Sequence, residues 1–223
     1  MKKLLIVVAL FSLFCVPAFA QDFPKAEIFG GYSILKSDTG LDQTEELSGS
    51  DFEIPGFSDA TVSNLDAKNW QLQGFDTSFT YNATAVFGVE ASFRYNRGDV
   101  LCMDVTVDDV TVPIEAKLKD IAFGVGPKFT FRNDSPVTPF GHVLIGFDNM
   151  KIDVSGSSDG QSISVEALSD TGLGVTLGGG LDVKVNDNFA IRIVQADYYM
   201  TRHMDETQNN FALSFGVVFG FGD

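Results

Sequence analysis

The sequence contains few cysteines and few basic residues, and no long apolar run follows its N-terminal segment. It holds 2 cysteines in 223 residues. Cys15 lies in the N-terminal apolar stretch, so Cys102 alone remains and no internal disulfide can hold the fold. The 15 Lys and Arg stand against 30 Asp and Glu. This balance excludes nucleic acid as an expected partner, because binding to a phosphate backbone requires clustered cations.

The first residues are predicted to form a targeting segment. Two lysines follow the initial Met, residues 4–16 are apolar, and Ala18 and Ala20 supply the small residues of a peptidase site, as in a secretory signal peptide. A retained membrane helix is the alternative, but this run is shorter than a spanning helix requires. We therefore expect a signal peptide over residues 1–20, cleaved after Ala20, and an exported domain over residues 21–223. No later apolar run can span as a helix, so any membrane insertion must use strands.

The rest of the chain alternates with a period of two. In the final segment small residues oppose a bulky apolar face, which comprises Phe211, Leu213, Phe215, Val217, Phe219 and Phe221. Segments 121–132 and 171–185 repeat this pattern, and four others follow it with varying clarity. The faces of segment 189–200 cannot be assigned, since Arg192 and Asp197 fall on opposite sides. The sequence thus offers eight candidate strands.

The links between these segments alternate in length. Short links rich in Asn and Asp, which tight turns favour, occur at residues 82–84, 133–136 and 186–188. Long links fall at residues 36–68, 97–118, 151–169 and 201–209. Alternation within residues 100–112 indicates that one pair of strands extends beyond the membrane as a hairpin. Short periplasmic turns and long external loops are typical of outer-membrane barrels.

We therefore predict an all-β fold, an eight-stranded antiparallel up-and-down transmembrane β-barrel. Both termini are expected in the periplasm, with the long loops outside a bacterial outer membrane. A soluble barrel of the lipocalin kind shows the same alternation with reversed polarity. The face opposite the phenylalanines favours the membrane barrel, because it carries small residues that suit a narrow lumen, namely Gly124, Gly126, Gly172, Gly174, Gly178, Gly180 and Gly216.

Three further stretches carry a likeness to known proteins: Glu27-Ile28-Phe29-Gly30-Gly31-Tyr32-Ser33, Pro139-Phe140-Gly141-His142 followed by residues 143–146, and the closing residues 211–222. Through them, and over nearly all of residues 23–222, the sequence resembles the outer membrane protein A-like family of small eight-stranded barrels and the related opacity-type surface proteins. The resemblance implies a barrel without a catalytic signature. It also implies outer-membrane lipid, lipopolysaccharide and the barrel-assembly machinery as partners.

Ionisable residues on the small-residue faces are expected inside the barrel. A charge in a narrow lumen is costly unless it is paired, so these residues should form ion pairs and hydrogen bonds that fill the lumen. The predicted network comprises Glu27, Asp76, Glu90, Arg94, Lys128, Arg132, His142, Asp148, Asp182 and Lys184. The alternative is a porin-like channel, a narrow path for ions or small solutes along the same charges.

Nothing in the sequence indicates a catalytic residue, a cofactor site or a metal site. Some barrels of this size are lipid-modifying enzymes that use a Ser, a His and an acidic residue. The available histidines are His142 and His203. His142 faces the lumen with Ser92 and Glu90 as conceivable partners, but no spacing motif supports a triad. We therefore expect no catalysis and no cofactor.

The long links are acidic, which usually indicates a solvated surface. A sharper hypothesis is that they contact an unknown extracellular partner, or divalent cations shared with lipopolysaccharide, although no calcium-loop pattern occurs. The predicted function is a structural, envelope-integrity or surface-interaction role. A narrow channel is the second alternative and a lipid-modifying enzyme the third.

Overall fold

The computed structural model describes residues 23–36, 60–67, 71–107, 110–158, 161–203 and 206–222. Its strands are β1 (Ala26–Lys36), β2 (Ala60–Ala67), β3 (Gln71–Asn82), β4 (Phe87–Val107), β5 (Val110–Thr130), β6 (Val137–Ser158), β7 (Gln161–Asn186), β8 (Phe189–His203) and β9 (Glu206–Phe221). Within these ranges, no helix is long and apolar enough to cross a membrane. The predicted signal peptide lies outside the described residues and stays a prediction.

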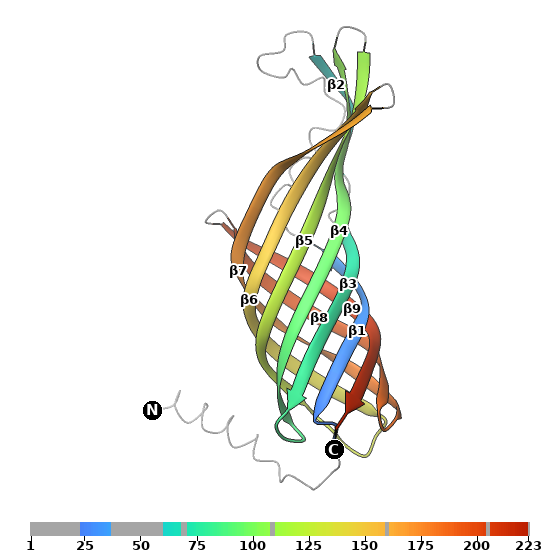
Figure 1. The fold of residues 1–223 in the computed structure, drawn as a ribbon, viewed down its shortest axis with the longest axis vertical. Coiled ribbons are helices and arrows are strands. Elements are labelled where there is room, and N and C mark those ends of the chain that lie inside the picture. The colour runs from blue at the N-terminus through green and yellow to red at the C-terminus, as the bar shows by residue number, and fades with distance from the viewer. Residues whose placement is uncertain are drawn as a thin grey trace.

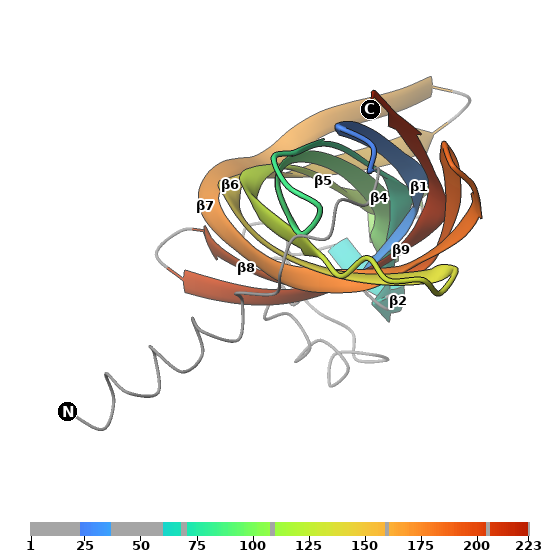
Figure 2. The same ribbon diagram turned by 90° about the horizontal axis from the view of Figure 1, so that it is seen from below.

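Eight of these nine strands close into a barrel. With β2 set aside, each strand from β1 to β9 pairs antiparallel with the next, and β9 pairs back with β1. Seen along its axis, the sheet forms a closed ring (Figure 2). The predicted eight-stranded up-and-down barrel is therefore confirmed.

The short links all lie at one end of the barrel. They join β3 to β4, β5 to β6 and β7 to β8. At the same end Lys25 donates a backbone hydrogen bond to the carbonyl of Gly222, which ties the start of β1 to the end of β9. We call this the turn end and the opposite one the extended end.

At the extended end, three links predicted as long loops are strands. β4 and β5 stay paired as far as Val107 and Val110, and β6 and β7 as far as Ser158 and Gln161. Pairing satisfies the backbone hydrogen-bonding groups of these links, which a loop would leave to water. The hairpin expected within residues 100–112 is correct. The prediction of loops is wrong at residues 97–118, 151–169 and 201–209.

β2 lies within the first long link, where the sequence predicted no strand. It pairs with residues 101–107 of β4, beyond Arg97, which is the last β4 residue that pairs with β3. β2 therefore continues the line of β3 along β4. Together β2, β4, β5, β6 and β7 form an extended sheet that rises beyond the barrel (Figure 1).

The two faces of the barrel have the predicted polarity. Large apolar side chains point outward with 36–65% of their surface exposed, Phe93 and Ile145 marking the two limits. Polar, charged and small residues point inward over most of the barrel, and apolar residues do so only toward the extended end. Gly146 shows why glycine is needed there, because a Cβ at this position would lie 1.7 Å from the carbonyl oxygen of Phe123. The reversed polarity of a soluble barrel is excluded.

Candidate functional site

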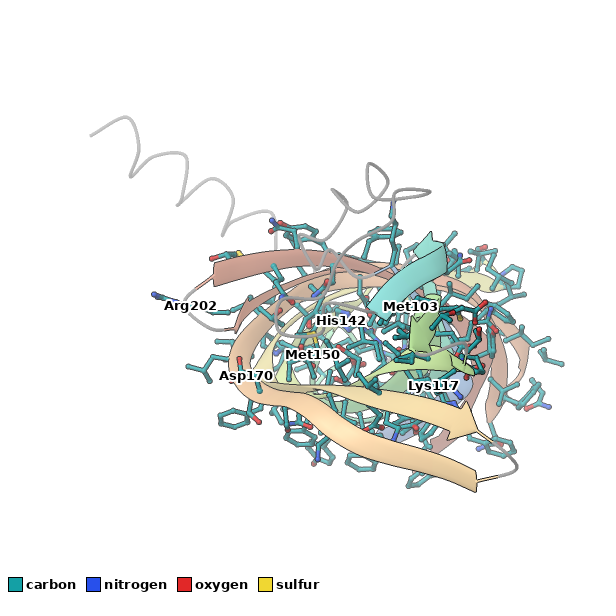
Figure 3. The ribbon with its side chains drawn as sticks, turned by 90° about the horizontal axis from the view of Figure 1, so that it is seen from above. Met103, Lys117, His142, Met150, Asp170 and Arg202 are labelled. Carbon is teal, nitrogen blue, oxygen red and sulfur yellow. The ribbon has the colours of Figure 1, made fainter. Side chains whose placement is uncertain are left out.

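The lumen is the candidate site, and His142 on β6 lies at the middle of its polar part. The His142 Nδ1 atom lies 2.7 Å from Oε1 of Glu90 on β4, and its Nε2 atom lies 3.0 Å from Oδ1 of Asp197 on β8. All three side chains are buried. Figure 3 shows His142 within the ring of strands. The imidazole therefore joins two carboxylates from different walls of the barrel.

On the turn-end side of His142, the network continues through Lys128 of β5. Its Nζ atom lies 3.0 Å from Oε2 of Glu90 and 3.6 Å from Oε2 of Glu27. Glu27 in turn accepts hydrogen bonds from Asn82 at 3.1 Å and from Arg132. Charge-assisted hydrogen bonds of this kind are among the stronger ones in proteins. They link β1, β3, β4 and β5 across the turn end.

The other carboxylate partner of His142 leads to Arg94 of β4. Its guanidinium bonds Asp197 and lies 3.4 Å from Oδ2 of Asp76 on β3. Asp76 also accepts hydrogen bonds from Gln195 at 3.2 Å and Ser214 at 3.0 Å. Gln195 donates again to Asp197 at 2.9 Å. The network thus crosses the lumen and connects most strands of the barrel.

Arg192 on β8 is among the largest side chains that are fully buried in the described residues. Its Nε and Nη2 atoms donate to the two carboxylate oxygens of Asp182 at 2.8 and 3.0 Å, and Nη1 donates to Gln195 at 2.6 Å. The guanidinium lies between the rings of Phe29 and Phe140, 4.2 and 4.0 Å from their centroids. Cation–π contacts of this kind stabilise a buried cation. They explain why Phe29 occupies an otherwise polar inner face.

A β-bulge brings Arg192 and Asp197 onto the same side of β8. The pairing register shifts between Arg192 and Gln195, where Ile193 and Val194 both point outward. One additional residue in a strand reverses the parity of everything after it. The structure therefore resolves the faces of segment 189–200, and the sequence missed Arg192, Gln195 and Asp197 as lumen residues for this reason.

Close packing around these charges requires glycine on β7, the strand between β6 and β8. A Cβ on Gly178 of β7 would lie 2.0 Å from Oδ1 of Asp197 and 2.8 Å from Nε2 of His142. The small-residue face of β7 thus leaves room for the side chains of its two neighbouring strands, β6 and β8. The remaining space is small, since the cavity beside Arg94, His142 and Tyr199 measures about 20 Å³, roughly the volume one water needs.

Toward the extended end, the lumen becomes apolar. After a layer that holds Asp120, Asp148 and Tyr199, a hydrophobic cluster closes the interior, with Ile152 and Val154 packed against it. We call this the apolar cluster; it consists of Leu35, Leu72, Val100, Ala116, Leu118, Met150 and Ala212. Figure 3 shows Met150 inside the ring of strands. This cluster was not predicted from the sequence, although strand parity places its members on inner faces.

The structure places the predicted network residues in the lumen, with one difference. The side chains of Glu27, Asp76, Glu90, Arg94, Lys128, His142, Asp148 and Asp182 are buried, and Arg132 lies partly buried at the turn end.

Lys184 lies outside this network, so its predicted place in the lumen is wrong. Its side chain is 55% exposed and its Nζ atom lies 2.8 Å from Oδ1 of Asp187 in the turn after β7. Lys184 keeps the parity of Asp182, but it lies beyond the end of the polar network, which on this strand ends at Asp182, so its side chain extends to the turn.

In the described part of the chain, no group of three or more His, Cys, Asp or Glu side chains could hold a metal ion. Cys102 is a free, half-buried thiol on β4.

Comparison with known proteins identifies the family. A family model described as an outer membrane protein beta-barrel domain matches residues 6–221. No curated protein matches the chain. Among solved structures, Ail, the attachment invasion locus protein of Yersinia pestis, is 23% identical over 89% of this chain and 100% of that one, with a TM-score of 0.49. Neisserial surface protein A is 15% identical over 90% of this chain and 100% of that one, with a TM-score of 0.47.

Proposed function

Because the chain belongs to the outer membrane protein beta-barrel domain family, we propose that it is a non-catalytic barrel of the bacterial outer membrane with a structural or surface-interaction role. In this proposal the lumen carries no solute. Its side chains hold the eight walls together, so that the extended sheet is displayed on a rigid base.

This proposal rests on one observation: two layers of different packing fill the lumen, one after the other along the barrel axis. The ionic network around His142 and Arg94 occupies the middle and the turn end. The apolar cluster around Leu35 and Leu118 occupies the extended end. An ion moving along the axis would have to break paired buried charges and then enter an apolar layer, and both steps are costly. A narrow channel is therefore the less favoured function.

The chemistry of His142 supports the absence of catalysis. Both ring nitrogens already face carboxylates, at 2.7 and 3.0 Å, and the side chain is buried. A general base must reach the proton that it takes from a substrate, whereas His142 is enclosed among the charges of the network. Ser92 lies near the same small cavity, which has no room for an acyl chain.

The proposed orientation follows from the asymmetry of the two ends. Outer-membrane barrels place short turns in the periplasm and long connections outside. The turn end, with both ends of the described chain, is accordingly assigned to the periplasm, and the extended sheet to the cell surface. The proposal further includes cleavage of residues 1–20, insertion of residues 21–223 by the barrel-assembly machinery, and surface contact with an external partner through the acidic connections.

Two measurements on refolded protein test this function. In planar lipid bilayers we expect no steady conductance, and a large steady conductance would favour the channel instead. Incubation with lipopolysaccharide or phospholipid should release no fatty acid. Release that disappears in His142→Ala, while the variant keeps the heat-dependent gel mobility of a folded barrel, would assign an enzyme.

A further inference from the structure

Asp120 of β5 and Asp148 of β6 form a pair of carboxyl groups inside the barrel. Asp120 pairs with Met150 and Asp148 pairs with Ala122, so the two acids are diagonal neighbours on the inner face of these strands. They are 4% and 1% exposed. The side chain of Asp120 is hydrogen-bonded to that of Asp148. We call these two residues the carboxyl pair.

The contact within the carboxyl pair requires a proton. An ionised carboxylate only accepts hydrogen bonds, so a hydrogen bond between two carboxyl groups forms when one of them is protonated. Like charges repel strongly where little water screens them, and two carboxyl groups in one buried site therefore share a single proton. The carboxyl pair has this geometry and this burial, which indicates one shared proton.

The other charges of the lumen are balanced without the carboxyl pair. Their ion pairs join equal numbers of cations and carboxylates. His142 counts as a cation, because both of its ring nitrogens face carboxylates and both must therefore donate. The cations are Arg94, Lys128, Arg132, His142 and Arg192, and the carboxylates are Glu27, Asp76, Glu90, Asp182 and Asp197. Ionisation of both members of the carboxyl pair would give the lumen a net negative charge, which is costly in a buried site.

Among the described side chains, ionisable groups face the carboxyl pair from three other strands. They are Arg94 of β4, Tyr199 of β8 and, one row further out, Asp170 of β7. Arg94 donates its hydrogen bonds to Asp76 and Asp197. The Tyr199 hydroxyl has no hydrogen-bond partner, so it does not donate to either acid. The proton is therefore held between the two carboxyl groups themselves.

The carboxyl pair lies where the ionic network meets the apolar cluster. Leu118 is two residues from Asp120 along β5, and Met150 is two residues from Asp148 along β6, and both belong to the apolar cluster. The cavity beside Tyr199 measures about 20 Å³, and neither acid lines it. This arrangement favours a proton over a hydrated metal cation as the species that neutralises the carboxyl pair.

We propose that Asp120 and Asp148 bind one proton between them in the folded barrel at neutral pH, so that the barrel becomes less stable as the pH rises. In the unfolded chain both carboxyl groups are ionised at this pH. Folding therefore takes up a proton, and acid favours the folded state. Release of the proton would place two negative charges against the apolar cluster. The carboxyl pair is thus a pH-sensitive contact between the two layers that fill the lumen.

Infrared spectroscopy of the refolded full barrel in lipid vesicles at neutral pH detects the shared proton directly. A protonated carboxyl group absorbs at a frequency separate from that of ionised carboxylates, and we expect this band in the wild type. Asp120→Asn and Asp148→Asn should each lose it, because the new amide donates to the remaining carboxylate. Asp182→Asn is the matched control and should keep the band, since Arg192 binds this carboxylate. Absence of the band from the wild type, or its presence in both variants of the pair, would overturn the proposal.

Urea unfolding between about pH 5.5 and about pH 7.5 measures the coupling to stability. Heat-dependent gel mobility first establishes that each protein is folded. The unfolding equilibrium constant of the wild type, divided by that of Asp148→Asn, should rise about tenfold per pH unit, because the wild type releases one additional proton on unfolding. A ratio that stays constant with pH, or that follows the sodium concentration instead, would contradict the shared proton. Neither result depends on conductance, so this inference can fail while the proposed function stands.

Discussion

The two halves of the lumen are filled by different kinds of side chains. The turn-end half fills the space with charges whose partners come from different strands, as Arg94 contacts Asp76 and Asp197. The extended-end half fills it with aliphatic side chains such as Leu35 and Leu118. Ion pairs depend on direction and register, whereas aliphatic packing depends mainly on volume. The polar half should therefore tolerate errors of register and charge poorly, and the apolar half should respond mainly to lost volume.

The largest expected effect comes from breaking the register of a strand in the polar half. Deletion of Val143 would send either His142 or Leu144 outward, because a shift of one residue exchanges the two faces. We expect this protein to lose the heat-dependent mobility of a folded barrel.

Deletion of Val194 is the matched control for that experiment. It removes the additional residue of the bulge and leaves Arg192, Gln195 and Asp197 in strict alternation, so a folded barrel should form. If the Val143 and Val194 deletions behave alike in refolding assays, the register argument is wrong.

The next effect concerns a single charge. Asp197→Ala would leave Arg94 and His142 without a shared carboxylate in a buried site. Removal of one partner from a buried ion pair typically costs about 3–5 kcal/mol. Urea titration of the variant in lipid vesicles should show a loss of this size in the free energy of unfolding. A loss below about 1 kcal/mol would mean that solvent reaches the network.

A smaller loss is expected in the apolar half. Leu118→Ala would leave a cavity in the apolar cluster, and such changes cost roughly 2–5 kcal/mol according to how far the site collapses. Leu177→Ala on β7 is the control, since this side chain is 60% exposed on the outer face and lipid can fill the space. The same urea titration should give a clearly smaller loss for Leu177→Ala. Equal losses would contradict the assignment of Leu118 to a closed interior.

The smallest effect is expected at the turn end, outside both halves. The Lys184 ammonium lowers the pKa of Asp187 through a hydrogen bond and its charge. A carboxyl whose pKa is lowered in the folded protein stabilises the fold at pH values above its unfolded-state pKa. This stabilisation is lost as the pH falls through its folded-state pKa. Because the pair is exposed and screened by solvent, Asp187→Asn should leave the unfolding midpoint in urea unchanged at pH 7 and at pH 3.

The sequence predicted the barrel because alternation directly reports the two faces of a strand. It also identified charges such as Glu90 and Lys128, whose parity is regular. It failed at two kinds of position: the bulge beside Arg192 reversed the parity of Asp197, and Lys184 lies past the end of the lumen, which alternation alone does not locate. Apolar residues on inner faces, such as Leu35, were not recognised as interior residues, because alternation alone does not predict an apolar layer inside a polar lumen.

Strand extension was underestimated for a different reason. Acidic, polar segments between membrane-spanning strands have the composition of loops, yet β6 and β7 remain paired as far as Ser158 and Gln161. Pairing between hairpin arms is a cooperative property of two segments, which the composition of either one does not report.

If the ionic network and the apolar cluster each close the lumen, single-channel recording of four proteins in planar bilayers will show it. Arg192→Ala/Asp182→Ala removes both members of one ion pair, so that no buried charge loses its partner. Leu35→Ala/Leu118→Ala thins the apolar cluster. We predict no steady conductance for the wild type or for either double variant, and a measurable conductance only when all four substitutions are combined. Steady conductance in the wild type, or in either double variant that still migrates as a folded barrel, would show that the two layers do not each close the lumen.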